Sequence, residues 1–440
     1  MPSALPKTEH EIRDPIHVFI KLRSDERRIL DSHPVQRLRS IQQLGMSHYV
    51  YPGATHKRFE HSLGVMEVAT RIYDVVTDKH NITDPIRELL PEVTDEIAVR
   101  YWREVVRMAA LLHDVGHVPY SHVAEGLLPD GYTHEDLTRI VIEQSELAEL
   151  LQGMAQPLNP QHVVKLALGQ EELKGVMGFS RWESILSEII TGDSLGADRI
   201  DYLLRDSYHC GTAYGRFDHY RLIDTMRILA SGTGEPALGI EEGGIHAVEA
   251  LWLARYFMYS QVYMHPVRRV YDKHLQRFLQ GWLPDGHFAV EVKEHLDLTD
   301  LEVWSAVAQA SKERIDVATR LARRQHYKLA WSRSSADRTP KRVGEMIASE
   351  LKEMFGEAEV EYDNYLPKGS PMPSFPVSRD LSDVVDCTVV SELLATLPIT
   401  RVEFVFVNPS RLKEAKTWIE NNEQRLRQEE VQGQREEVSS

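Results

Sequence analysis

The sequence predicts a mainly α-helical protein with short strands near its N-terminus and a smaller α+β region toward its C-terminus. In VRYWREVVRMAALLHD, apolar residues recur every three or four positions, which is the spacing of one buried helix face. In ITRVEFVFVNP, β-branched and aromatic residues alternate as they do in a strand. The chain has 440 residues, 42% of them hydrophobic, which is enough for a large core.

The elements can be followed in chain order. A proline-bounded turn in IRDPIHVFIKL predicts a short strand pair. A helix is predicted across SLGVMEVATRIYDVV, with His61 just before its start. The next helix should end in His113 and Asp114, because Gly116 and Pro119 follow and disfavour a helix. Further helices are predicted over SEIITGDSLGADRIDYLLRD and GIHAVEALWLARYFMYSQVYMH.

The C-terminal third has a different pattern. Helices are predicted to continue to about Trp331, and YLPKGSPMPSFPV indicates a loop. We therefore predict a helical core over 1–290 and an α+β region over 291–422. The tail NNEQRLRQEEVQGQREEVSS is polar throughout, and we expect a solvated helix end followed by disorder within 423–440.

Composition excludes several classes of protein. The chain has 51 Lys and Arg against 67 Asp and Glu, a formal net charge of -16, which disfavours nonspecific nucleic-acid binding. Two cysteines, Cys210 and Cys387, argue against a disulfide framework or a cysteine zinc site. No run approaches the ~20 apolar residues that span a bilayer, and the N-terminus lacks a signal-peptide pattern. We expect a cytoplasmic protein without membrane partners.

The segment AALLHDVGHVPYSH has the residue types of a metal site. The side chains of the adjacent His113 and Asp114 diverge by about 100° on a helix, so a cation between them can contact both. Imidazole and carboxylate ligands suit iron, manganese, zinc or magnesium. His61 in KRFEHSLG and Asp198 in LGADRIDYLLRD could add further ligands. An isolated His-Asp pair is more often structural, but this wider constellation favours a metal site.

Asp198 belongs to a polar helix face. Tyr202 and Asp206 follow it at four-residue steps, whereas Ile200 and Leu203 point the other way. A polar face opposite an apolar one is typical of a cleft wall.

The order His61, His113, Asp114, Asp198 resembles the four-ligand metal site of the HD-domain metal-dependent phosphohydrolases. RDPIH, VQRLRSIQQLG, HKRFEHSLGV, LLHDVGHVPYSH, ADRIDYLLRD and QVYMHP narrow the resemblance to the deoxynucleoside triphosphate triphosphohydrolases, over roughly residues 10 to 290. It implies an HD-domain core and a divalent metal. It also implies hydrolysis of deoxynucleoside triphosphates to deoxynucleoside and inorganic triphosphate, in a homotetramer activated by a nucleotide between subunits.

The resemblance also assigns roles to individual residues. The implied metal ligands are His61, His113, Asp114 and Asp198. The implied reaction centre contains His117, His122, Glu125 and His134. The implied phosphate-binding residues are Arg58, Arg199, Tyr202 and Arg255. The implied sugar- and base-binding residues are Gln43, Leu44, Asp206, Tyr263 and His265. The positions that read an activating guanine base match Asp31 and Arg39.

Two departures from the vertebrate members of this family stand out. Arg199 replaces a lysine, which keeps the charge but changes its geometry, and Glu125 replaces an aspartate. Simpler roles also stay open for single residues: a helix cap for His134 and a core aromatic for Tyr263. Asp31 and Arg39 could likewise be a cap and a surface charge.

Two other functions stay open. An HD protein can instead cleave a monophosphate, a cyclic dinucleotide or an alarmone. Alternatively, the chain is a nucleotide-binding sensor whose metal site is not catalytic. The three phosphate-directed arginines favour a triphosphate substrate, and the complete ligand set favours catalysis.

One of His117, His122 or His134 can protonate a leaving 5′ oxygen, because histidine titrates near neutrality. The resemblance implies that this general acid is His122, supported by Glu125. We expect His122→Ala to abolish turnover while the metal content stays normal, as measured by nucleotide hydrolysis and elemental analysis of the same preparation. Loss of metal from the variant would contradict this assignment.

Overall fold

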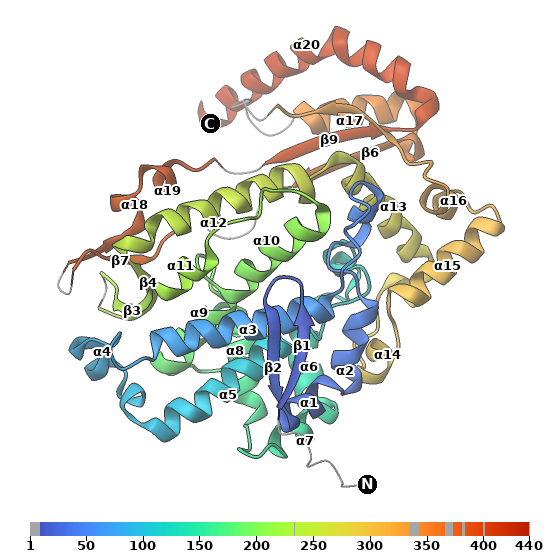
Figure 1. The fold of residues 1–440 in the computed structure, drawn as a ribbon. Coiled ribbons are helices and arrows are strands. Elements are labelled where there is room, and N and C mark those ends of the chain that lie inside the picture. The colour runs from blue at the N-terminus through green and yellow to red at the C-terminus, as the bar shows by residue number, and fades with distance from the viewer. Residues whose placement is uncertain are drawn as a thin grey trace.

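The fold of the computed structural model is mainly helical, with short N-terminal strands and small sheets toward the C-terminus, so the predicted fold class is confirmed (Figure 1). The structure describes residues 9–232, 234–334, 343–365, 373–380, 383–398 and 401–439. The side chains of His122, Glu125 and residues 430–439 lie outside the described part.

A bundle of helices forms the core. The helices up to residue 282 are α1 (Ser24–Leu30), α2 (His33–Arg37), α3 (Arg58–Val76), α4 (Asp84–Leu89), α5 (Glu96–Leu112), α6 (His134–Gln144), α7 (Glu146–Gln152), α8 (Pro160–Glu172), α9 (Arg181–Thr191), α10 (Ala197–Cys210), α11 (His219–Asp224), α12 (Ile245–Met258) and α13 (Pro266–Trp282). Helix α3 lies in the middle and packs against α5, α9 and α10 (Figure 1). It is buried on nearly all sides because these neighbours cover it from different directions.

The later part of the chain adds helices beside and above this core (Figure 1). They are α14 (Val292–Leu296), α15 (Asp300–Lys312), α16 (Asp316–Ala322), α17 (Val343–Phe355), α18 (Cys387–Val390), α19 (Glu392–Thr396) and α20 (Leu412–Ser439). Among the described residues, no helix is both long enough and apolar enough to cross a membrane.

The strands form three small sheets. They are β1 (Glu9–Asp14), β2 (Val18–Arg23), β3 (Met226–Ala230), β4 (Pro236–Glu241), β5 (Lys328–Ser332), β6 (Val360–Tyr365), β7 (Pro376–Ser378), β8 (Val384–Asp386) and β9 (Val402–Val407). The predicted pair β1 and β2 is an antiparallel hairpin. The other sheets have the orders β3-β4-β7-β8 and β5-β9-β6. The predicted strand β9 is central in its sheet and buried, because α17 packs against it.

Three predicted boundaries are wrong. His61 lies in the first turn of α3 rather than before it, because the Glu60 side chain accepts a hydrogen bond from the Lys57 N–H (2.7 Å) and helps the helix begin at Arg58. The helix predicted across residues 187–206 is two helices, interrupted between 191 and 197, where two glycines disfavour a continuous helix. Trp331 lies in β5 rather than at a helix end, because this segment pairs with β9.

The C-terminal tail is helical further than predicted. The sequence predicts a solvated helix end followed by disorder, whereas helix α20 continues to Ser439. Arg427 pairs with Glu423 (2.7 Å) and Arg425 pairs with Glu429 (2.8 Å), each four residues apart, which favours a helix even without packing. The proposed division at residue 290 stays a prediction.

Two apolar clusters determine where the loop after α5 lies. The first cluster includes the buried residues of α3, α5, α8 and α9. The second joins Val118, Tyr120 and Val123 from that loop to Tyr271 of α13 and Val303 of α15. The segment that follows His113 is therefore held by residues nearly 200 positions further along the chain.

Gly64 allows α3 and α10 to approach closely. A Cβ atom at this position would overlap the Asp201 carboxylate and the Arg205 guanidinium, both buried on α10. We expect Gly64→Ala to lower the free energy of unfolding by about 1 to 3 kcal/mol, the usual cost of overpacking. Gly178→Ala is the control, because Gly178 is exposed and its added Cβ meets open space. Denaturant titration tests this; equal midpoints for the two variants would contradict it.

Candidate active site

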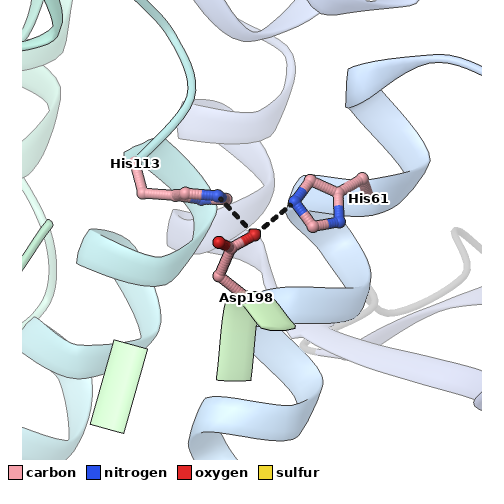
Figure 2. Close-up of side chains that lie close together, drawn as sticks. All are labelled: His61, His113 and Asp198. Atoms are coloured by element: carbon pink, nitrogen blue, oxygen red, sulfur yellow. Dashed lines mark hydrogen bonds and ion pairs between the residues drawn. The ribbon is translucent and has the colours of Figure 1, made fainter. Parts of the chain in front are cut away.

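Three potential metal ligands converge from three helices. His61 comes from α3, His113 follows the last residue of α5, and Asp198 lies in the first turn of α10 (Figure 2). One ligand atom from each lies within 4.8 Å of the other two. His61 Nε2 is 3.0 Å from Asp198 Oδ1, and His113 Nε2 is 3.7 Å from the same oxygen.

Asp114, the fourth predicted ligand, lies beside this group. Its Oδ1 is 3.4 Å from His113 Nε2, and its Oδ2 is 3.8 Å from His61 Nε2. The carboxylate also accepts a hydrogen bond from Arg58 (2.5 Å) and lies 3.1 Å from His117 Nε2. The structure thus brings all four predicted ligands together, although Asp114 already has other partners.

The hydrogen bonds of His113 leave one ring nitrogen directed at the carboxylates of this group. His113 Nδ1 donates to the carbonyl oxygen of Ala110 (2.8 Å), so Nε2 is the nitrogen that can bind a cation once it is deprotonated. That buried Nε2 finds no hydrogen-bond partner within the described part of the chain. It faces the carboxylates of Asp114 and Asp198, whose negative charges need a positive group beside them. A divalent metal with nitrogen and oxygen ligands supplies one.

A second layer of buried polar groups orients His61. Its Nδ1 donates to Asp201 Oδ2 (2.8 Å), which leaves Nε2 directed at Asp198. The other oxygen of Asp201 is 2.7 Å from His17 Nε2. Arg205 donates to both oxygens of Asp201 (2.8 and 3.0 Å) and to Asp14 (2.9 Å). Such a carboxylate partner sets the tautomer and orientation of a metal-binding histidine.

The charges of this network shift the pKa values of its members. Burial by itself lowers the pKa of His61, but Asp198 and Asp201 outweigh it and raise the pKa to about 10. Burial raises the pKa of Asp201, but Arg205, His17 and His61 hold it well below its usual range. Asp201 is therefore a permanent anion, and a metal ion must displace a proton from His61.

The four predicted metal ligands line one large cavity of about 1060 Å³. The predicted site residues that line it are Gln43, Leu44, Arg58, His61, His113, Asp114, His117, His134, Asp198, Arg199, Tyr202, Asp206, Arg255 and Tyr263. His265 does not line it; its Nδ1 accepts a hydrogen bond from Val267 N (3.2 Å) at the start of α13.

Two arginines face the cavity with unused hydrogen-bond donors. The Nε and Nη1 of Arg199 and the Nε of Arg255 are buried, and none of them has an acceptor among the described residues. Both guanidinium groups lie over the Trp252 ring, at 5.5 and 5.2 Å, and Arg255 also lies over Tyr259 at 4.8 Å. Aromatic contacts hold the planes in place while their N–H groups stay available for a ligand.

Arg58 is more fully engaged. Its Nε donates to Ser121 Oγ (2.7 Å), and its Nη1 donates to Asp114. It joins the metal cluster to the loop that precedes His122.

Of the three histidines expected at the reaction centre, His117 and His134 have described side chains and lie together. His117 stacks on His134 with ring centroids 4.1 Å apart and lies 3.1 Å from Asp114. Burial, with Arg58 and His134 adding to it, holds the pKa of His117 well below its usual value. Thr133 rather than His134 caps α6, so the capping role left open for His134 is wrong. The side chains of His122 and Glu125 lie outside the described residues.

A polar pair occupies the wall expected to contact sugar and base. Tyr263 donates to Asp206 Oδ2 (2.7 Å), and the other oxygen of Asp206 is 2.7 Å from His56 Nε2. Tyr263 lies in a short π-helical turn after α12, where it lines the cavity and also packs against the first apolar cluster. Leu44, 8% exposed, is the predicted apolar residue of the same cavity.

Asp31 and Arg39 lie away from the cavity. Asp31 accepts a hydrogen bond from Arg27 (3.1 Å), whereas Arg39 donates to Gln36 (2.8 Å) and lies 3.5 Å over the Phe59 ring. Both are exposed, so they are accessible to a ligand between molecules.

Sequence reasoning missed the buried polar layer behind His61. Its members Asp14, His17 and Arg205 belong to the segments RDPIH and ADRIDYLLRD, which were noted only as motifs. The available signal was the four-residue spacing of Asp201 and Arg205, which predicts an ion pair on α10. Its partners on the N-terminal hairpin could not be inferred from spacing.

Two family models match the chain. The model of the HD domain matches residues 58–174, and that of the HD associated region matches residues 217–365. Among solved structures, a hypothetical protein from Aquifex aeolicus is 32% identical with a TM-score of 0.77, over 93% of this chain and 99% of that chain. A phosphohydrolase from Bacteroides thetaiotaomicron, 23% identical with a TM-score of 0.68 over 91% of this chain and 99% of that chain, shares the fold.

The two curated relatives described next are longer than this chain. An uncharacterized protein of Methanocaldococcus jannaschii is 36% identical over 333 residues, which cover 75% of this chain and 61% of that protein. The deoxynucleoside triphosphate triphosphohydrolase SAMHD1 of Bos taurus is 28% identical over 291 residues, which cover 61% of this chain and 47% of that protein. The chain thus spans about half to three fifths of these two relatives.

Asp201 is the residue through which the second layer can be tested. We expect Asp201→Asn to weaken metal binding by about 10- to 100-fold, because the variant loses the anion that orients His61. Titration of the metal-free protein with Mn²⁺ measures this. Asp316→Asn is the control, because its carboxylate is 77% exposed and pairs only with Arg320 among the described residues. Equal affinity in both variants would contradict the assignment.

Proposed function

Since the chain belongs to the family of HD-domain metal-dependent phosphohydrolases, we propose that it hydrolyses deoxynucleoside triphosphates to a deoxynucleoside and inorganic triphosphate. One observation carries this proposal. A single cavity holds a His/Asp group suited to a cation and two buried arginines whose N–H groups have no acceptor in the described part of the protein. The name of the bovine relative supports the choice of substrate.

The donors of Arg199 and Arg255 that have no acceptor among the described residues support a substrate that carries several phosphate groups. A buried N–H without an acceptor carries a desolvation cost of about 1 to 3 kcal/mol, which a bound phosphate oxygen removes. Arg199 and Arg255 together offer three such donors. Planar guanidinium groups suit phosphate oxygens because they can donate two parallel hydrogen bonds. Arg58 and Tyr202, which line the same cavity, complete the proposed phosphate-binding set.

The reaction requires one bond exchange at phosphorus. A water oxygen forms a bond to the α-phosphorus as the bond from that phosphorus to the 5′ oxygen breaks. A divalent cation held by His61, His113 and Asp198, with Asp114 beside them, would polarise a phosphoryl oxygen and lower the pKa of a water. Magnesium, manganese, iron and zinc all suit these ligands.

The 5′ oxygen leaves as an alkoxide and takes up a proton. We assign this proton to His122, supported by Glu125, as the family resemblance implies. His117, which contacts Asp114, and His134, which stacks on His117, would lie near the water and the phosphate.

Leu44 and Tyr263 are proposed to select the sugar. An apolar Leu44 and the Tyr263 ring packed against the ribose would leave a 2′-hydroxyl unpaired or clashing. Burying an unpaired hydroxyl costs about 1 to 3 kcal/mol, so deoxy substrates should be preferred by about 5- to 150-fold. Gln43 and His265 would lie near the base, with His265 reached only if the cavity extends to it.

Regulation is proposed at a separate surface. Asp31 and Arg39 are exposed and could contact an activating nucleotide between subunits of a homotetramer. Addition of dGTP should then accelerate dATP hydrolysis in the native chain but not in Asp31→Ala.

Product identification tests the proposed function. Protein of known metal content is incubated with each deoxynucleoside triphosphate, singly and mixed, and with ATP. We expect deoxynucleoside and inorganic triphosphate as products, with dATP hydrolysed faster than ATP. Equal rates for dATP and ATP would remove the sugar-selection role of Leu44 and Tyr263.

Other products would identify another function. Orthophosphate or a monophosphate as the product would point to a phosphohydrolase of different substrate. Full metal occupancy without turnover of any nucleotide would point to a sensor.

A further inference from the structure

The loop between α5 and the reaction centre contains an unusual backbone turn. Tyr120 and Ser121 have φ angles of 59° and 54°, so two consecutive residues other than glycine adopt the left-handed conformation. That conformation is unfavourable for residues with a Cβ and persists only where surrounding contacts hold it. The turn leads directly into His122, the proposed proton donor.

One carboxylate from a distant part of the chain holds this turn. Asp300, the first residue of α15, is 3% exposed, and its Oδ1 accepts a hydrogen bond from the Tyr120 N–H (2.8 Å). The Tyr120 ring is buried in the second apolar cluster, which includes residues of α13 and α15. Asp300 lies within the segment matched by the HD associated region.

The second oxygen of Asp300 holds another segment of the cavity wall. Its Oδ2 accepts a hydrogen bond from the Gln42 N–H (2.7 Å). Gln43 and Leu44, which follow directly, line the cavity. Gln42 also forms a β-bridge with Lys57, immediately before Arg58. One buried carboxylate thus joins the turn before His122 to the segment expected to contact sugar and base.

Arg37 also connects this loop to the residues just before α15. Its Nη1 donates to the carbonyl oxygen of His117 (2.9 Å), and its Nε and Nη2 donate to that of Leu298 (3.1 and 2.8 Å). The segment 298–300 is therefore connected to the loop at two points, through Arg37 at 117 and directly at 120. Ser121 is held from the opposite side by Arg58, whose Nε donates to its Oγ.

We propose that Asp300 is a positioning residue that holds the left-handed turn at Tyr120 and Ser121 and thereby presents the reaction-centre loop to the cavity. Its role goes beyond stabilising α15, because Thr299 already caps that helix through a reciprocal contact with Glu302. The Asp300 side chain is directed instead at two backbone N–H groups outside its own helix. The catalytic part of this inference rests on the proposed function; the structural part does not.

The test compares Asp300→Asn with Glu302→Gln in the full-length chain. An asparagine has one acceptor oxygen, so one of the two N–H groups loses its partner or faces the amide NH₂. Glu302→Gln weakens the start of the same helix without touching Gln42 or Tyr120. Hydrogen exchange of segments 40–44 and 117–124, metal content and nucleotide kinetics are measured for both variants.

We expect Asp300→Asn to speed exchange of these two segments at least tenfold relative to Glu302→Gln, with unchanged metal content. The kcat should fall at least tenfold in Asp300→Asn and less than twofold in Glu302→Gln, at similar melting temperatures. Equal exchange in the two variants, or an equal loss of kcat, would overturn the proposal. If the native chain turns over no nucleotide, the proposed function fails, and exchange together with metal content still decides whether Asp300 holds the turn.

Discussion

The site depends on one buried carboxylate. Asp201 accepts hydrogen bonds from His61, His17 and Arg205, and so ties α3, the N-terminal hairpin and α10 together. An isolated carboxylate with no exposed surface would be very costly, and here three partners compensate its charge. The same hydrogen bonds direct His61 Nε2 at Asp198. Fold stability and ligand geometry therefore depend on a single group, and Gly64 leaves the space in which the helices can meet around it.

The metal-ligand group and two of the cavity's arginines lie in different parts of the cavity. Anionic and imidazole groups gather where α3, α5 and α10 meet, and two arginines lie over Trp252 on another part of the wall. A metal ion at the first place and phosphate oxygens at the second would each compensate groups that have no partner among the described residues. The net charge of -16 does not oppose an anionic ligand, because the charges that matter are local and buried.

The later part of the chain contributes to the site as well as to the fold. Helix α13 supplies residues that cover the loop after α5, and α15 supplies Asp300, which contacts two segments of the cavity wall. A left-handed turn of non-glycine residues needs such external contacts, because its local sequence disfavours it. The match to an HD associated region thus coincides with residues that hold the HD domain's loop in position.

The sequence by itself determined the mainly helical fold, the hairpin and the four residues that meet at the candidate metal site, since local periodicity and motif order carry that information. It could not supply the partners of those residues. In the sequence alone, the partners look like ordinary polar residues of a hairpin and a helix: Asp14, His17, Asp201 and Arg205. Asp300 likewise looks like part of a helix start, and only packing brings these residues to their partners. Only the tertiary structure decided the contacts between distant segments, because a buried charge is stabilised by whichever distant group shares its low-dielectric surroundings. Spacing along the chain encodes only pairs within one helix, such as Asp201 with Arg205.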